Sequence, residues 1–305
     1  MSPRHDTTTL SRVPGGLLEG PRYDSRWGLI YADAAHGGVH SLAENGTGHV
    51  LIPHRRGIGG LVLHEQDGAV ITGRNVAYKP FTPGRTEPAP TEVLLDKDPK
   101  AHRVGFNDLT TDLAGRVYVG SLGFVAMEDA VDGSAAGPPG SLWVIDLDGA
   151  VSSLADDIAL SNGMAFDPTG TVLYQCDSGR RLVFAYELDL EGALPKVVER
   201  SVFAELPEGV PDGIAVDVEG GVWVALAHQG KIVGLEQSGR VVDTITIPLP
   251  MVTSMCFGGA GMRTLYIVTG AHGDPDGSAG IFACEMDVAG VPIAPARTPT
   301  GRGQR

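Results

Sequence analysis

The chain has 305 residues, of which 42% are hydrophobic and 20% charged, and its formal net charge is −14. This length allows one large β domain or two ordinary domains. The negative charge argues against nucleic acids and anionic membranes as partners, because their phosphates would repel the protein. No apolar run is long enough to span a membrane, and residues 1–14 lack the apolar core of a signal peptide, so we expect a cytoplasmic protein.

The cysteines and the turn-forming residues narrow the class further. Cys176, Cys256 and Cys284 each lie in an apolar, strand-like run, without disulfide or metal-binding spacing, which indicates buried free thiols. The sequence contains 43 glycines and 21 prolines. No segment keeps the apolar period of a helix over three turns, so the pattern favours many short strands joined by tight turns.

A strand pair that opens on a polar or small residue recurs along the chain. The openings are Glu19, Gly60, Asn107, Asn162, Asp212 and Ser254, at spacings of 41, 47, 55, 50 and 42 residues. Each interval has the size of one propeller blade. We therefore predict an all-β fold, a six-bladed β-propeller of four-stranded antiparallel blades at residues 15–292. An N-terminal segment (1–14) precedes it, and a disordered tail (293–305) follows.

The predicted strands follow one order in most units. The first unit has strand-like segments at 17–23, 29–32 and 38–42, and the second has them at 60–63, 70–72 and 76–78. The third unit is the longest, because residues 121–140 interrupt it before the strand at 141–145. The last three units cover residues 162–188, 212–235 and 253–284. Crossover helices, which a parallel α/β fold requires, are lacking.

The polar openings predict a metal site on the propeller axis. Successive antiparallel strands reverse direction, so the starts of the inner strands share one face and surround the channel mouth. Carboxylate and amide oxygens suit a hard divalent cation, with Ca²⁺ first and Mg²⁺, Mn²⁺, Zn²⁺ and Fe²⁺ left open. The alternative is structural: these side chains would cap turns or bridge neighbouring blades.

Four motifs at these openings resemble those of the gluconolactonase/regucalcin (SMP-30-like) family. They are Glu19-Gly20-Pro21, Phe106-Asn107-Asp108, Ser161-Asn162-Gly163 and Pro211-Asp212-Gly213, and Phe257-Gly258-Gly259 with Leu265-Tyr266 is also similar. The resemblance implies a six-bladed propeller with one central metal and hydrolysis of lactones. It implies Glu19, Asn162 and Asp212 as metal ligands, with Asn107 beside the metal in contact with water or substrate.

Two features depart from the family pattern. Gly105 stands where sugar lactonases of the family often carry an arginine, and Arg103 is a candidate replacement. Residues 121–140 contain Phe124, Val125 and Met127, which makes this insert apolar for a sugar-binding lid. Both departures allow a more hydrophobic lactone or ester as substrate.

The predicted function is metal-dependent opening of a lactone. The metal would polarise the carbonyl, and a water oriented by Asp212 or Asn107 would attack it. His36, His228 and His272 are candidates for substrate binding and for protonating the leaving alkoxide, the alternative for each being an exposed turn histidine.

Other functions remain open at this point. The protein could be a non-catalytic metal-binding propeller, or a metal-dependent hydrolase of a linear ester or phosphotriester. The chain has no G-x-S-x-G nucleophile motif, which argues against a serine hydrolase. We expect a small-molecule lactone or ester as partner, and a monomer or small homo-oligomer.

Overall fold

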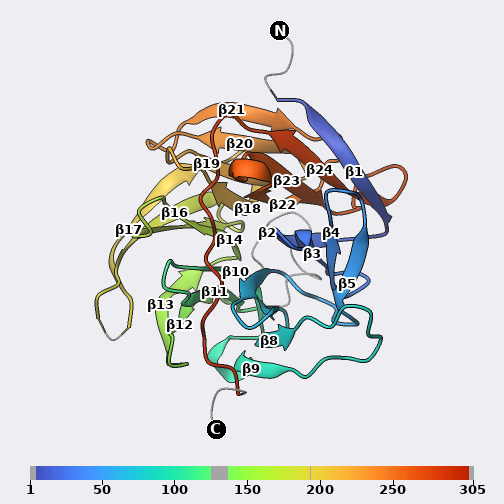
Figure 1. Ribbon diagram of the computed structural model, residues 1–305. Coiled ribbons are helices and arrows are strands. Elements are labelled where there is room, and N and C mark those ends of the chain that lie inside the picture. Colours follow the sequence, from blue (N-terminus) through green and yellow to red (C-terminus); the bar gives the residue numbers. More distant parts are fainter. Residues whose placement is uncertain (1–4, 125–136, 193, 302–305) are drawn as a thin grey trace.

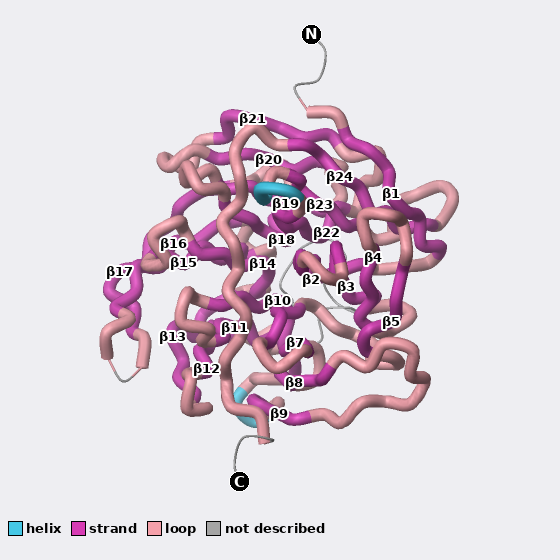
Figure 2. The backbone as a smooth tube through the Cα atoms, in the orientation of Figure 1, coloured by secondary structure: helices cyan, strands magenta, loops and turns pink. Residues whose placement is uncertain are grey.

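The computed structural model describes residues 5–124, 137–192 and 194–301, and these residues form six four-stranded antiparallel sheets. The sheets surround a common axis as the blades of a propeller (Figure 1). Short 3-10 turns at Pro99–Ala101 (η1) and Ala260–Met262 (η2) are the helical elements of this part of the chain, as the tube in Figure 2 shows. No helix in the described ranges is long and apolar enough to cross a membrane. The predicted six-bladed, all-β architecture is confirmed.

The blades take their strands in chain order from the axis outward, except that the last blade also takes the first strand of the chain. Blade 1 contains β2 (Leu18–Asp24), β3 (Gly28–Asp33), β4 (Val39–Leu42) and β5 (Gly48–Ile52). Blade 2 contains β6 (Leu61–His64), β7 (Gly68–Ile71), β8 (Val76–Pro80) and β9 (Glu92–Leu95). Blade 3 contains β10 (Gly105–Thr111), β11 (Val117–Leu122), β12 (Gly140–Ile145) and β13 (Val151–Ile158).

The remaining blades follow the same plan. Blade 4 contains β14 (Ser161–Phe166), β15 (Val172–Asp177), β16 (Leu182–Asp189) and β17 (Lys196–Glu205). Blade 5 contains β18 (Val210–Val216), β19 (Val222–Ala227), β20 (Lys231–Leu235) and β21 (Val241–Thr246). Blade 6 contains β22 (Val252–Gly258), β23 (Thr264–Thr269), β24 (Ser278–Glu285) and β1 (Thr7–Pro14). We call the face where the inner strands start the site face, and the opposite one the far face.

Repeated aspartate turns on the far face join the first two strands of blades 3, 4 and 5. In blade 5, Oδ1 of Asp217 accepts hydrogen bonds from the backbone N–H groups of Glu219 and Gly221, at 3.0 and 2.8 Å. Gly220 completes the turn with a φ of 87°, which a residue with a Cβ adopts only at a cost. Asp112 and Asp167 accept similar bonds in their own turns. The Asp-x-x-Gly pattern therefore specifies these turns locally.

The hydrophobic core lies between the blades. Six clusters of buried side chains each join one blade to the next around the ring. Between blades 1 and 2, for example, Ile30, Leu51 and Ile52 pack with Leu61 and Ile71. Burial of such side chains from both faces of each sheet explains why a second strand such as β19 reads as a continuous apolar run.

The chain ends differ from the sequence-based expectation. Residues 7–14, expected to form a segment outside the propeller, pair with β24 as strand β1 of blade 6. The tail, expected to be disordered from residue 293, crosses the far face as far as its described part extends, to residue 301 (Figure 1, red). There Ala296 donates its N–H to the Leu63 carbonyl and is fully buried. Polar composition had suggested disorder, but backbone hydrogen bonds to distant blades order this segment.

Candidate functional site

Glycines bring the polar strand starts of neighbouring blades side by side on the site face. A Cβ built on Gly163 would lie 2.4 Å from the carbonyl oxygen of Asp212, and one on Gly59 would lie 2.3 Å from Oδ1 of Asn107. These distances leave no room for a side chain. Asn162, which precedes Gly163, is therefore held next to Asp212.

Glu19 and Asp212 form a pair of interacting carboxylates near the axis. Asp212 is buried, whereas Glu19 keeps part of its surface exposed. Loss of hydration raises the pKa of Glu19 well above its usual range, and the charges of Asp212 and Asp108 raise it further. Burial also raises the pKa of Asp212, Asp108 adds to the rise, and a hydrogen bond from Asn162 opposes it. Neither carboxylate forms an ion pair within the described residues, so their charge is uncompensated.

This donor set fits a divalent cation. Two carboxylates without a counter-charge and the amide oxygen of Asn162 are oxygen ligands of the kind that hard cations prefer. No three His, Cys, Asp or Glu side chains form a metal-binding cluster in the described part of the chain. The predicted site therefore depends on an amide ligand as well as on the two carboxylates.

Ser178 connects Asn162 to the strand that carries Asp212. It lies in the turn after β15, where its Oγ accepts a hydrogen bond from Nδ2 of Asn162 at 3.2 Å. The same hydroxyl donates to the carbonyl of Pro211, directly before Asp212. With Nδ2 engaged in this way, Oδ1 of Asn162 is the atom left to act as an acceptor. The sequence does not single out Ser178, because its two partners come from different segments of the chain.

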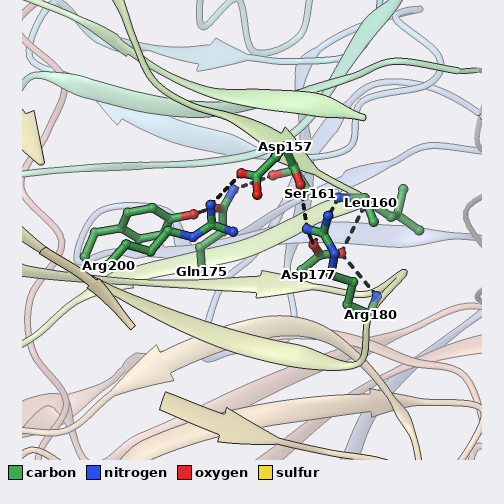
Figure 3. Close-up of polar contacts among 9 residues, drawn as sticks. Asp157, Leu160, Ser161, Gln175, Asp177, Arg180 and Arg200 are labelled. Carbon is green, nitrogen blue, oxygen red and sulfur yellow. Dashed lines mark hydrogen bonds and ion pairs between the residues drawn. The ribbon is translucent and has the colours of Figure 1, made fainter. Parts of the chain in front are cut away.

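A second network holds the turn that contains Ser178 (Figure 3). The Asp177 carboxylate accepts hydrogen bonds from the backbone N–H groups of Ala159 and Leu160 and from the Arg180 guanidinium, at 3.0, 3.1 and 2.9 Å. Nearby, Nε2 of Gln175 donates to Oγ of Ser161 at 2.7 Å. These contacts fix the start of β14, and with it Asn162. The side chains of Ser161, Gln175 and Asp177 are fully buried, whereas Arg180 is exposed.

Asn107 joins two blades at the edge of the site. Its Nδ2 donates to the Ser161 carbonyl at 3.0 Å, which ties blade 3 to blade 4. Such a contact is what we expect if the polar side chains at the strand starts bridge neighbouring blades. Its Oδ1 lies against Gly59. A role of Asn107 toward water or substrate therefore remains a proposal.

Asp108 and Arg22 are buried charges that the sequence analysis did not select. The guanidinium of Arg22 donates to the carbonyls of Pro21 and Leu109, at 2.7 and 2.8 Å, and so links the inner strands of blades 1 and 3. Burial lowers the pKa of Arg22, and Asp108 opposes this effect. Burial raises the pKa of Asp108, and Arg22 opposes that. The available signal for both was their place at the strand-start motifs, since Asp108 follows Asn107 and Arg22 follows Glu19-Gly20-Pro21.

The predicted histidines lie on turns of the site face. Nδ1 of His36 lies 2.7 Å from Oδ2 of Asp33, and its side chain is 55% exposed. His228 and His272 contact each other edge to face, with ring centroids 5.4 Å apart. Burial lowers the pKa of His228, and His272 lowers it further. His36 is thus oriented by a carboxylate, whereas the other two form a separate pair.

Arg103 makes its contacts away from the carboxylate pair, and most of the insert lies outside the described residues. The Nε–H of Arg103 donates to the Asp96 carbonyl at 3.0 Å, and its guanidinium stacks on the ring of Trp143 at 4.8 Å. The structure places no described contact between Arg103 and the carboxylate pair. Phe124 is buried, and Val125 and Met127 lie outside the described residues.

A cavity of about 130 Å³ occupies the opposite end of the axis. Its lining is largely apolar, with Phe166, Ile214 and Met255 among the residues, and Pro292 and Ile293 of the tail contribute to it. None of the predicted site residues lines this cavity. The polar site and this apolar cavity are therefore separate features at the two ends of the channel.

The comparisons with known proteins settle the family. Residues 17–271 match the family model described as SMP-30/Gluconolactonase/LRE-like region. The chain belongs to this family. The resemblance expected from the strand-start motifs is confirmed.

Two relatives and one solved structure show what this member of the SMP-30/gluconolactonase family is similar to. An uncharacterized protein from Sulfolobus acidocaldarius is 33% identical, over 91% of this chain and 94% of its own. A 6-deoxy-6-sulfogluconolactonase from Pseudomonas putida is 30% identical, over 85% and 84%. The calcium-binding protein regucalcin from Agrobacterium tumefaciens aligns with a TM-score of 0.78 at 20% identity, over 97% and 98%. The last likeness concerns the fold.

Proposed function

We propose that this protein is a divalent-metal-dependent lactonase. The observation that carries the proposal is the uncompensated carboxylate pair of Glu19 and Asp212, with Asn162 hydrogen-bonded to Asp212. Identity to a 6-deoxy-6-sulfogluconolactonase over most of both chains supports a lactone as substrate. The all-oxygen donor set favours Ca²⁺ as the first metal to test.

The proposed ligands are Glu19, Asn162 and Asp212. A divalent cation bound there would polarise the lactone carbonyl and stabilise the oxyanion as a Lewis acid. Ser178 and Asp177 keep Asn162 in position, and Asp212 orients the attacking water through its carboxylate. Asn107 is the second candidate to orient the water or the substrate. His36, held by Asp33, and the pair of His228 and His272 are candidates to contact the substrate on the rim.

Release of ring strain makes a lactone an easier target than an amide, so modest activation suffices. Ring opening releases a proton, which a pH-indicator assay follows directly. We expect turnover of several lactones by the Ca²⁺-loaded protein, loss of turnover after treatment with a chelator, and recovery on adding metal back. An absence of metal-dependent turnover over a broad panel would instead favour a non-catalytic metal-binding propeller.

The same panel separates the other hydrolase candidates. Linear carboxylic esters lack ring strain, and phosphotriesters place a phosphoryl oxygen where the carbonyl would lie. Turnover of either class, in preference to lactones, would keep the metal site and change the reaction. We expect lactones to have the higher kcat/KM.

A further inference from the structure

Two arginines near the channel mouth have no partner among the residues that the structure describes. Most of the described arginines donate to a carboxylate or a carbonyl group. Within the described ranges only Arg56, Arg74 and Arg85 do not, and all three are exposed. In a chain with a net charge of −14, carboxylates are abundant, so an unpaired guanidinium is unusual. Arg85 lies in the loop after β8, which hydrogen-bonds to the outer strand β5 through Thr82 and Leu51.

Arg56 and Arg74, here called the arginine pair, are held on adjacent backbone segments of the site face. Arg56 precedes Gly57 in the connection between blades 1 and 2, and Arg74 follows Gly73 in the turn after β7. A Cβ on Gly73 would lie 2.3 Å from the Gly57 carbonyl oxygen. The backbones that carry the two arginines are therefore in direct contact.

The same segments adjoin the strand start that carries Asn107. Gly73 and Phe106 exchange two backbone hydrogen bonds, of 3.1 and 2.7 Å. Gly59, three residues after Arg56, packs against Asn107. Gly57 also donates to the Ala34 carbonyl at 3.0 Å, next to the turn of His36. The arginine pair thus lies along the arc of the rim between His36 and Asn107.

Arg55 fixes the turn that presents Arg74. Its guanidinium donates to the carbonyls of Thr72 and Asn75, at 3.2 and 3.1 Å, and to Oδ1 of Asn75 at 2.7 Å. Nearby arginines thus have different roles. Arg55 uses its guanidinium to hold the turn at residues 72–75, whereas Arg74, which lies on that turn, has no partner among the described residues. A rigid turn loses little entropy when its guanidinium engages a ligand.

The two unpaired guanidinium groups suit an anionic group of a ligand. Glu19, Asp108 and Asp212 gather three carboxyl groups at the centre of the site, and these groups offer no binding partner to an anionic substituent. Guanidinium groups on the rim recognise a carboxylate, phosphate or sulfonate by bidentate hydrogen bonding. A neutral lactone offers no anionic group for the two exposed arginines to bind.

We propose that Arg56 and Arg74 select a lactone that carries an anionic substituent, by binding that substituent at the rim while the ring lies over the metal set. This inference rests on the proposed function and names its substrate class. The pair acts in specificity and takes no part in the bond-breaking step.

A matched pair of substrates tests the proposal. D-gluconolactone and D-glucarolactone, both used as five-membered rings, differ in carrying a hydroxymethyl group or a carboxylate at the end of the carbon chain. For the wild-type protein we expect the higher kcat/KM with D-glucarolactone, and a preference that shrinks as NaCl is added. Arg56→Gln and Arg74→Gln should each lower that preference about tenfold, and the double variant more.

Controls separate charge at the rim from charge in general. Turnover of D-gluconolactone should stay within about twofold in all variants, because the pair does not contact a neutral ring. Arg85→Gln removes the same charge in the loop that packs on β5 and should leave the preference unchanged. A double variant that keeps the wild-type preference, or an Arg85→Gln protein that loses it equally, would overturn the proposal.

A binding measurement keeps this inference apart from the proposed lactonase activity. Calorimetric titration of the Ca²⁺-loaded protein with D-glucarate and with D-gluconate compares a dianion and a monoanion of the same skeleton. We expect tighter binding of D-glucarate and loss of the difference in the double variant. If neither lactone is opened, the proposed function fails, while the titration still decides on the arginine pair. Equal binding of D-glucarate by wild-type and double-variant protein would refute the proposed role of the arginine pair.

Discussion

Two aspartates at opposite ends of β18 have similar burial and different surroundings. Asp217, on the far face, accepts two backbone hydrogen bonds within its turn and a third from Nε1 of Trp223 at 3.0 Å. Asp212, on the site face, faces Glu19 and Asp108 and receives support from Asn162. The repeat supplies the same residue type to both ends of the strand. Their partners differ: Asp217 is held by hydrogen bonds within its turn, whereas Asp212 has no ion pair among the described residues.

Exchanging each aspartate for asparagine tests this difference with the largest expected effect. Asp212→Asn should reduce metal-dependent lactone turnover on the order of a thousandfold, because it removes an anionic ligand. The melting temperature of the metal-free protein should not fall. Asp217→Asn should do the reverse, keeping turnover per folded molecule and lowering the free energy of unfolding by about 1–2 kcal/mol. Wild-type lactonase rates in Asp212→Asn would end the proposed scheme.

Removing the tail tests whether the far face is purely structural. Deletion of residues 289–305 breaks backbone hydrogen bonds from Val291, Ala296 and Arg297 to blades 5, 2 and 3. We expect a loss of about 3 kcal/mol in the free energy of unfolding, measured by urea denaturation. Turnover of the folded fraction should remain near the wild-type value. A parallel loss of metal affinity would show that the two ends of the channel are coupled.

Ser178→Ala should affect the site face by a smaller amount. The substitution removes the hydroxyl that links Asn162 to the Pro211 carbonyl. Loss of such a supporting contact weakens metal binding about tenfold, which calorimetry with Ca²⁺ measures. Ser238→Ala is the matched control, because that hydroxyl bonds to the exposed Glu236 on another turn. Unchanged Ca²⁺ affinity in Ser178→Ala would remove Ser178 from the positioning network.

The smallest expected effect concerns His228 and pH. Burial lowers the pKa of His228 in the folded protein. At a pH between the pKa of the unfolded chain, about 6.5, and the lower pKa of the folded protein, the unfolded chain therefore binds more protons. Stability from this residue therefore falls as the pH falls through that window. His228→Asn keeps the left-handed backbone, with φ of 66°, and should flatten this part of the stability curve by less than about 1 kcal/mol. The exposed His102, also left-handed, provides the control His102→Asn.

The fold was predictable because each blade carries its own local signals. Alternating apolar strands, Asp-x-x-Gly turns such as Asp217 to Gly220, and a regular interval between strand starts all repeat in sequence. That repeat also predicts that Glu19, Asn162 and Asp212 lie on one face. The structure brings Asn162 next to Asp212 and the charges of Glu19 and Asp212 within interaction range.

The contacts that the sequence did not reveal are those between distant segments. Arg22 finds the Leu109 carbonyl 87 residues away, and Ser178 reaches the Pro211 carbonyl across a blade interface. The pairing of β1 with β24 joins residues near both ends of the chain. No local periodicity encodes such partners, since each depends on the closure of the whole ring.

Both ends of the chain are hydrogen-bonded to other blades, and this affects how the molecule unfolds. Strand β1 completes the sheet that β22 began, and the tail bonds to blades 5, 3 and 2. A solenoid can fray from its terminal repeat, but here neither terminal repeat is free to peel away. Amide hydrogen exchange in the inner strands should therefore proceed by opening of the whole ring, with protection of similar size in all six blades.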